Sequence, residues 1–416
     1  MSKLSFIHCS DLHLDSPFSG LALAKPELRN ILQKATLQSF DNIVSLAVRE
    51  KVDAVLIAGD VYDSADQSLR AQLAFRNGLA KLSENGIPSY VVHGNHDPLK
   101  AWSSSLNWPQ LATVFPTDKV GATPIYRDGK KLATVHGISY PERDVKENLA
   151  LRFKQKSENG FAIGLLHTNA EGDPNHENYA PCRLEDLIAA KMDYWALGHI
   201  HSNKTLREST PAIVYCGNSQ GRGFHEAGPR GCCVVTLRSN LPPEIRFEET
   251  NAVRFQEVTV DISQSANLDD AVAEIVDECK TIATKTDQIQ FIIRVRLTGQ
   301  TILHKELKRE DALEALSDEI QNRFEVLGLW VELKLETRDV YNIDSLCRGN
   351  DFLADMIHLY AEAEKPEGLE EIRAVLQPVF DDWQGGRFLD EPTENDLREL
   401  LTQARGLSLD NLTEPE

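Results

Sequence analysis

Short apolar runs alternate with amphipathic stretches over the first part of the chain. Residues 4–8 form an apolar run of strand length, and apolar residues then recur at mostly helical spacing over 27–49. A second apolar run, 52–58, is followed by a second helical stretch, 67–84, and by a strand that Pro88 opens. This order predicts parallel strands joined by helical crossovers, which defines an α/β domain.

The same pattern continues and places polar residues directly after the strands. Further strands are predicted at 131–136, 161–166, 194–197, 212–216 and 232–237. Five strands end in residues that can bind a metal ion: Asp11 with His13, Asp60, Asn95, His167, and His199 with His201. Ligands of open α/β sheets lie beyond the carboxyl ends of the strands, so we expect these five loops to converge on one edge.

The pattern changes after the last of these strands. Residues 239–250 contain Pro242-Pro243 and are interpreted as a boundary. Strands at 255–262, 290–297 and 329–335 then alternate with helices at 268–281 and 310–325, which predicts a small α+β domain. We therefore expect three parts, residues 1–240, residues 251–338 and residues 339–416.

The last part is expected to be helical and acidic. Apolar residues recur at helical spacing in three stripes, at 352–360, 369–380 and 397–401, and residues 393–396 resemble a helix start. The stripes either pack as a small helical domain or on the body of the protein, or they form an element that docks a partner helix. The pattern leaves both alternatives open, because a stripe does not identify the surface that covers it.

Charge and cysteine content change this picture little. The formal net charge is −20, and the residues from Asp351 onward hold 17 acidic and five basic side chains. An aspartate-rich metal site counts as acidic although it presents a cation, so charge neither excludes nor supports a nucleic-acid partner. The seven cysteines form no Cys-x-x-Cys pair, which predicts reduced thiols and argues against a structural zinc site.

The hydropathy of the chain predicts a globular protein. Its hydrophobic share of 41% is enough for sizeable cores, and no apolar run approaches the length of about 20 residues that a membrane span needs. The first residues have neither a long apolar region nor a small-residue cleavage site. We therefore expect a cytoplasmic location and no membrane partner.

The strand-end residues form a mixed set of nitrogen and oxygen ligands. Carboxylate, amide and imidazole groups suit divalent ions such as Mn²⁺, Fe²⁺ or Zn²⁺, and the set lacks the thiolates of structural zinc sites. There are more ligands than one ion needs. With one bridging aspartate they divide into two sets, the arrangement with ions about 3.5–4 Å apart that hydrolyses phosphoesters by in-line displacement.

Five motifs in order carry a resemblance to a known family. Asp-x-His, Gly-Asp-x-x-Asp, Gly-Asn-His-Asp, a strand-end His and Gly-His-x-His resemble those of the calcineurin-like metallophosphoesterases. Within that superfamily, residues 8–18 and 217–222 resemble the bacterial DNA repair exonucleases of the SbcD and YhaO type. The resemblance covers about residues 1–240 and implies a four-layer α/β/β/α sandwich. Residues 251–338 resemble the family's capping domain only in placement and element order.

The resemblance also implies roles for individual residues. Two divalent ions are expected, Mn²⁺ preferred, with Asp11, His13, Asp60 and His201 on the first and Asp60, Asn95, His167 and His199 on the second. Hydroxide would attack phosphorus, and His96 would stabilise or protonate the leaving oxygen. Asp97 would orient His96. Asp63 is given a supporting role, because archaeal and eukaryotic nuclease relatives carry a histidine there.

The remaining polar residues receive a structural interpretation. Four histidines outside the ligand positions are expected to form hydrogen bonds at loops or strand ends: His8, His93, His136 and His176. Asp15 is interpreted as a turn cap and Cys9 as strand packing. Arg222 could touch a substrate phosphate or pair with a nearby carboxylate, and both alternatives stay open.

The leading hypothesis is a divalent-metal-dependent DNA exonuclease or endonuclease that acts in DNA repair with an SMC-like coiled-coil ATPase. Phosphodiester hydrolysis has physical support, whereas DNA, the ATPase and a homodimer are implied by the resemblance alone. One alternative is a small-substrate phosphodiesterase or phosphatase, although the capping domain and long C-terminal region favour the nuclease. Another is a protein that is chiefly an interaction subunit, but the intact ligand set argues against a vestigial metal site.

Overall fold

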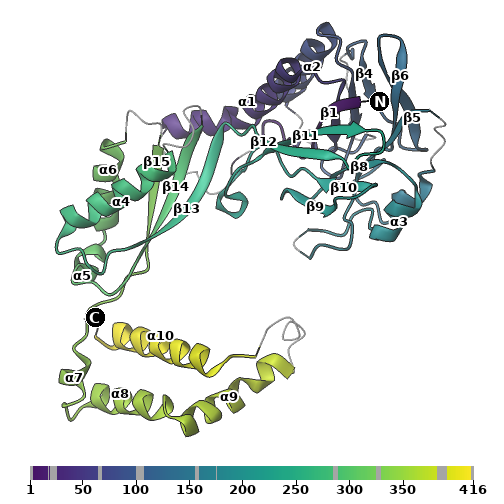
Figure 1. Cartoon of the computed structure of the whole chain (residues 1–416). Coiled ribbons are helices and arrows are strands. Elements are labelled where there is room, and N and C mark those ends of the chain that lie inside the picture. Colours follow the sequence, from purple (N-terminus) through teal and green to yellow (C-terminus); the bar gives the residue numbers. More distant parts are fainter. Residues whose placement is uncertain are drawn as a thin grey trace. The chain divides into compact units, whose positions relative to one another are not determined.

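A computed structural model of the chain describes residues 3–16, 18, 26–63, 68–99, 107–154, 159–174, 176–283, 289–324, 329–381 and 391–413 (Figure 1). The chain divides into two compact units. The first contains Met1–Glu257, Ala283–Ile293 and Gly328–Trp330, and the second contains Val258–Ile282, Arg294–Leu327 and Val331–Glu416. All the predicted metal ligands belong to the first unit.

The first unit contains a six-stranded sheet with the order β12-β11-β1-β2-β3-β4. Its strands are β1 (Lys3–Cys9), β2 (Ala54–Ala58), β3 (Ser89–Val92), β4 (Ala112–Val114), β11 (Gly231–Arg238) and β12 (Glu244–Glu249). β1 to β4 run parallel, and β11 pairs antiparallel with β1 and β12. The stretch 239–250, interpreted as a boundary, thus supplies the edge strand β12.

A second six-stranded sheet has the order β5-β6-β7-β8-β10-β9. Its strands are β5 (Gly121–Arg127), β6 (Lys130–Gly137), β7 (Phe161–His167), β8 (Tyr194–Gly198), β9 (Lys204–Arg207) and β10 (Ala212–Tyr215). The central strands β6, β7, β8 and β10 are parallel, and the edge strands β5 and β9 are antiparallel to their neighbours. The carboxyl ends of β7 and β8 carry predicted ligands.

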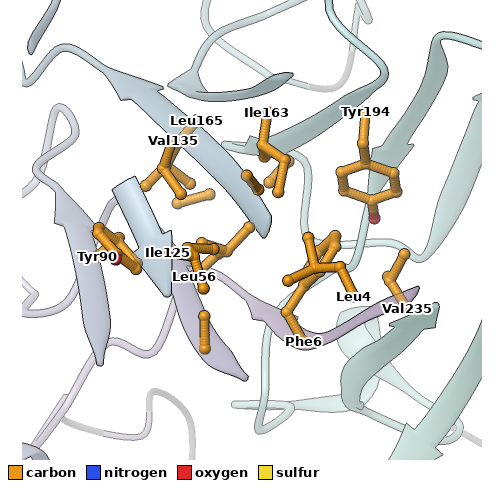
Figure 2. Close-up of a cluster of buried hydrophobic side chains, with 14 of the residues drawn as sticks. Leu4, Phe6, Leu56, Tyr90, Ile125, Val135, Ile163, Leu165, Tyr194 and Val235 are labelled. Carbon is orange, nitrogen blue, oxygen red and sulfur yellow. The ribbon is translucent and has the colours of Figure 1, made fainter. Parts of the chain in front are cut away.

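Three apolar clusters separate four layers of structure. Leu4, Phe6, Leu56 and Ile163 belong to a core between the two sheets, which Figure 2 shows. α1 (Pro26–Glu50) and α2 (Leu69–Glu84) cover the outer face of the first sheet. α3 (Leu184–Ala189) and the 3₁₀ turn η2 (Leu149–Arg152) pack on the outer face of the second. The predicted four-layer α/β/β/α sandwich is confirmed.

Burial on both faces explains why the strands read as continuous apolar runs. In β1, Leu4 and Phe6 face the core between the sheets, whereas Ile7 and Cys9 face α1 and α2. A strand covered on both faces needs apolar residues at successive positions. Cys9 therefore packs as expected, and all seven cysteines are free thiols.

In the described part of the chain, a three-stranded sheet, β13-β14-β15, alternates with three helices, and four more helices come after its last strand. Its strands are β13 (Val253–Asp261), β14 (Gln290–Thr298) and β15 (Leu329–Leu335), and the helices are α4 (Leu268–Ala283), α5 (His304–Leu307), α6 (Ala312–Asn322), α7 (Ile343–Leu346), α8 (Phe352–Ala363), α9 (Pro366–Asp381) and α10 (Glu394–Thr413). This order agrees with the predicted alternation of strands and helices.

The three C-terminal stripes bury part of their apolar surface against one another. Leu369, Leu397 and Leu401 form a buried cluster that joins α9 to α10, and Tyr360 of α8 packs on it. The Tyr360 hydroxyl lies 2.8 Å from Ser408 Oγ. Docking of a partner helix on this region stays a prediction. Among the helices that the structure describes, none combines the length and apolar character that a bilayer crossing requires.

Candidate metal centre

The predicted ligand loops are held together by backbone hydrogen bonds at one edge of the sheets. The amide of Asp11 donates to the carbonyl of Gly59 at 3.1 Å, and the amide of His13 donates to the carbonyl of Asp60 at 3.1 Å. These two bonds join the loop after β1 to the loop after β2. The amide of His199 donates to the Asp11 carboxylate, which ties in the loop after β8 from the second sheet.

Four of the predicted ligands have left-handed backbone conformations. The φ angles are 49° at Asp11, 42° at His13, 48° at Asp60 and 101° at His199. Such conformations cost residues other than glycine on the order of 1 kcal/mol or more each, and they collect at functional sites where the surrounding structure holds them. The interlocked loops therefore maintain strained backbone where the ligand side chains converge.

Asp11, His13 and His201 form the first ligand group. One side-chain donor atom from each lies within 4.8 Å of the others. The Nε2 atoms of His13 and His201 are 3.3 Å apart. His13 Nδ1 is buried and has no hydrogen-bond partner among the described residues, since Asp63 Oδ1 is 3.8 Å away. Two converging imidazole nitrogens beside a carboxylate fit a divalent cation.

The second group forms around Asp60 and His167. His167 Nδ1 donates to the carbonyl of Ala58 at 2.9 Å, so Nε2 is the nitrogen that a metal ion can bind when it displaces the Nε2 proton. That Nε2 lies 3.0 Å from Asn95 Oδ1 and 3.4 Å from Asp60 Oδ2. Asp11, Asp60 and His167 also offer donor atoms within 4.8 Å of one another. A ring nitrogen that faces two oxygen atoms and can release its proton suits a metal ligand.

His199 completes this group. Its Nε2 donates to the carbonyl of Glu177 at 2.8 Å, so Nδ1 holds the lone pair of the neutral ring. Burial lowers the pKa of His199 to about 3, which keeps the ring neutral. Its ring centroid is 5.2 Å from that of His167. The structure therefore brings all seven predicted ligands together at one edge.

Two buried carboxylates, Asp11 and Asp60, require compensating positive charge in the site. Burial raises the pKa of Asp11. Burial also favours the protonated form of Asp60, but the charge and hydrogen bond of His167 and the charges of His96 and His13 together hold its pKa well below the usual value. Burial by itself would lower the pKa of His167, but the charges of Asp60 and Asp11 and the hydrogen bonds to Asp60 and Ala58 together raise it to about 9. Adjacent buried carboxylates are costly unless cations compensate them, so this donor set fits divalent ions.

Glycines allow the loops to approach each other. A Cβ atom on Gly94 would lie 2.3 Å from Asp60 Oδ1 and 2.7 Å from His167 Nε2. A Cβ atom on Gly198 would lie 1.9 Å from the carbonyl oxygen of Ala58. Both distances are far inside van der Waals contact, so any larger residue would displace ligands.

His96 is paired with Asp63. Asp63 Oδ1 lies 2.8 Å from His96 Nδ1, and the amide of His96 donates to Asp60 Oδ1 at 3.0 Å. Burial favours the neutral form of His96, but the hydrogen bond to Asp63 and the charge of Asp60 raise its pKa. Burial would likewise raise the pKa of Asp63, yet the hydrogen bond from His96 lowers it well below the usual value. Asp63 therefore fixes the ring of His96.

Asp97 does not have the partner that was expected. Its Oδ2 lies 3.0 Å from His93 Nδ1 and accepts from the amide of Val61 at 2.9 Å, and its Oδ1 accepts from the amide of Gly94 at 2.9 Å. The bond to Gly94 turns this carboxylate back toward its own strand end, where it is fully buried. The pairing of Asp97 with His96 is thus corrected, and Asp63 takes that place.

Glu226, in the 3₁₀ turn η3 (Phe224–Glu226), was not anticipated from the sequence. Its Oε1 lies 2.8 Å from His201 Nδ1, so it orients a predicted metal ligand through the ring nitrogen that faces away from His13. Arg222, the other polar residue singled out in this region, pairs with both Glu226 and Asp63. The signal available in the sequence was a lone carboxylate four residues after Arg222 in a glycine-rich loop.

Of the histidines outside the predicted ligand set, His8 has a structural role, whereas His176 lies beside the predicted ligands. His8 hydrogen-bonds with Tyr194 Oη at 3.0 Å and with the carbonyl of Leu197 at 3.1 Å, as expected for a structural residue. His176 was assigned no site role, but its ring centroid lies 5.5 Å from that of His199 and 5.3 Å from that of His201. It is therefore a neighbour of the ligand rings.

Comparisons with known proteins agree with this site. A family model described as calcineurin-like phosphoesterase matches residues 4–203, so fold and site together define a metal-dependent phosphoesterase. A model of the middle domain of metallophosphoesterase YhaO matches residues 255–338. YhaO of Bacillus subtilis (strain 168) is 31% identical over 408 residues, which is 97% of this chain and 97% of that protein. The chain belongs to the YhaO family of calcineurin-like metallophosphoesterases.

Two further relatives extend the comparison. The DNA double-strand break repair protein Mre11 of Sulfurisphaera tokodaii is 25% identical over 319 residues, 74% of this chain and 78% of its own length. A subunit of the nuclease SbcCD of Bacillus subtilis (strain 168) is 23% identical over 259 residues, 54% of this chain and 64% of its own length. The resemblance to metallophosphoesterases and the hydrolase class are confirmed.

Proposed function

We propose that this protein is a divalent-metal-dependent phosphodiesterase acting on DNA, as an exonuclease or endonuclease. The observation that carries the hydrolytic chemistry is the convergence of seven ligand-type side chains from five strand ends around Asp11 and Asp60. DNA as substrate is supported by the names of two relatives, the repair protein Mre11 and the nuclease SbcCD.

The proposed centre holds two divalent ions. The first would be bound by Asp11, His13, Asp60 and His201, and the second by Asp60, Asn95, His167 and His199. The ions would supply a lowered pKa for a water molecule and positive charge for the phosphate oxygens. Mn²⁺ is the proposed metal, with Fe²⁺ or Zn²⁺ as alternatives, because the donors are imidazole nitrogens and hard oxygens without thiolate.

His96 is proposed to act on the leaving oxygen. Its Nδ1–H donates to Asp63, so Nε2 is the nitrogen available to a substrate. From that position the ring can donate a proton or a hydrogen bond to the oxygen as its bond to phosphorus breaks. Asp97 would serve the same step indirectly, because it holds the backbone at Gly94 from which His96 projects.

We also propose an SMC-like coiled-coil ATPase as a partner, with action in DNA repair. The support is the presence of Mre11 and a subunit of SbcCD among the relatives, together with a C-terminal helical region beyond the catalytic unit. A homodimer is compatible with this proposal. A small-substrate phosphodiesterase or phosphatase would use the same chemistry, and an interaction subunit would use the helical region.

Three substrates assayed together test the proposal. Purified protein with Mn²⁺ is offered end-labelled linear duplex, closed circular DNA and bis-p-nitrophenyl phosphate, beside the Asp60→Ala and His96→Ala variants. We expect metal-dependent cleavage of DNA that both variants lose. Hydrolysis of the small ester without attack on any DNA, even with the ATPase supplied, would refute the nuclease function. Equal DNA degradation by Asp60→Ala would refute the mechanism.

A further inference from the structure

Arg222 lies between two carboxylates that come from different loops. Its Nη1 is 3.3 Å from Asp63 Oδ2, and its Nη2 is 3.2 Å from Glu226 Oε1. The backbone amide of Arg222 also donates to Glu226 Oε2 at 2.8 Å. Asp63 follows β2 of the first sheet, whereas Glu226 lies in the turn η3 before β11. The guanidinium therefore bridges two separate segments of the site.

Each of these carboxylates holds one histidine. Asp63 Oδ1 is 2.8 Å from His96 Nδ1, and Glu226 Oε1 is 2.8 Å from His201 Nδ1. The chain of contacts therefore runs from the histidine proposed to face the leaving oxygen to a ligand proposed for the first ion. We propose that Arg222 is a positioning residue that couples these two histidines, and that it does not contact the substrate. This inference rests on the proposed function for the roles of His96 and His201.

Burial makes the bridge necessary. The side chains of Arg222 and Asp63 are 18% and 19% exposed, and that of Glu226 is 5% exposed. Two carboxylates in such surroundings need a compensating cation, and the planar fork of a guanidinium can satisfy both at once. Without the Arg222 side chain, Asp63 would keep Ser16 and Glu226 would keep Asn218 and the backbone amide of residue 222, but both would lose the cation that joins them. Both histidines would then become less well ordered.

Contact with a substrate phosphate would require a different arrangement of the Arg222 guanidinium. Bidentate binding of a phosphate requires guanidinium N–H groups that face the substrate. Here both Nη atoms are engaged with carboxylates, and the group is mostly covered. A substrate contact would raise KM when it is removed, because it contributes to binding. A positioning residue would lower kcat and weaken the metal site while KM stays nearly constant.

The test compares Arg222→Gln and Arg222→Lys with the wild-type chain. Binding of Mn²⁺ to EDTA-treated protein is measured by calorimetry, and kcat and KM are measured on bis-p-nitrophenyl phosphate. For Arg222→Gln we expect Mn²⁺ affinity to be about 10- to 100-fold weaker and kcat to fall by about the same factor. KM should stay within about threefold of the wild-type value. Arg222→Lys keeps the charge but not the fork, so its losses should be smaller.

Arg70→Gln serves as the matched control. Arg70 is another arginine of the first unit whose guanidinium pairs with a carboxylate, that of Asp15 at 3.6 Å. Its removal should change neither Mn²⁺ binding nor kcat. Circular dichroism of each variant shows that the fold is kept, and Arg222→Lys provides the test if Arg222→Gln does not fold.

Two results would overturn the inference. A rise in KM of tenfold or more with unchanged Mn²⁺ affinity would make Arg222 a substrate contact, by about 1.4 kcal/mol of lost binding. Unchanged Mn²⁺ affinity together with unchanged kcat would mean that Arg222 positions neither histidine. If the wild-type chain hydrolyses no phosphodiester, the proposed function fails, but the calorimetric comparison still decides the inference because it needs no turnover.

Discussion

The carboxylate of Asp63 lies 2.8 Å from the imidazole Nδ1 of His96 and accepts its hydrogen bond. The two residues are 33 positions apart and follow neighbouring parallel strands, β2 and β3. Their contact fixes which ring nitrogen can meet a substrate. The two carboxylates therefore have different roles: Asp63 holds the ring of His96, whereas Asp97 accepts a hydrogen bond from the backbone amide of Gly94.

The loss of kcat in Asp63→Asn should depend on the leaving group of the substrate. The amide keeps the size of the side chain but loses the charge that orients and protonates His96. We expect kcat to fall on the order of 10²-fold for a phosphodiester with an alkyl leaving group, and only slightly for the p-nitrophenyl ester, which needs no proton. Steady-state kinetics on the two esters measures the difference.

Asp15→Asn is the control for that comparison. Asp15 has a similar exposure to Asp63, 21% against 19%. Asp63 interacts with Ser16 and Arg222, and Asp15 likewise interacts with a serine and an arginine, Ser68 and Arg70. It should leave both reactions unchanged. An equal loss on both esters in Asp63→Asn would mean that Asp63 acts on the metal centre as a whole.

His96→Ala and Asn95→Ala should separate turnover from metal binding. Asn95 Oδ1 lies 3.0 Å from His167 Nε2, whereas the His96 ring is held by Asp63 outside that group. We expect His96→Ala to keep its metal and lose turnover by about 10²-fold or more. Asn95→Ala should bind the second ion more weakly. Metal content after dialysis, measured by mass spectrometry, distinguishes the two variants. Loss of metal in His96→Ala and its retention in Asn95→Ala would mean that the two residues have each other's role.

Asp97→Ala should destabilise the protein even when metal is removed. The substitution leaves His93 and the amides of Val61 and Gly94 without their buried acceptor. Breaking such a buried charged network costs about 3–5 kcal/mol. Urea unfolding in EDTA measures the loss, and Asp97→Asn should lose less because it keeps one acceptor oxygen. Wild-type stability in Asp97→Ala would contradict a structural role.

Gly94→Ala should weaken metal binding with little effect elsewhere. The added Cβ would lie 2.3 Å from Asp60 Oδ1, so the loop or the bridging carboxylate must move. We expect Mn²⁺ affinity to fall by a factor on the order of 10². Gly129→Ala is the control, because a Cβ there meets nothing within 4 Å and its φ of 74° tests backbone strain alone. Calorimetric titration with Mn²⁺ compares the two.

The sequence by itself determined the central strands of both sheets and the polar residues at their ends. Strands covered on both faces must be apolar at successive positions, so β1, β2, β7 and β8 were visible as runs, and polar residues at their ends marked the site. The edge strands β4, β5, β9 and β12 were not predicted. Edge strands are covered less completely, as the exposed positions of β5 and β9 show, and they carry no such run.

Only the tertiary structure decided which carboxylate serves which histidine. Asp97 is next to His96 in sequence, but a bond from the amide of Gly94 turns its side chain inward, toward His93. Asp63 reaches His96 because parallel pairing of β2 and β3 brings their loops together, and Glu226 reaches His201 from a turn 25 residues away. Side-chain direction depends on local backbone bonds and on packing between distant segments, which residue order does not specify.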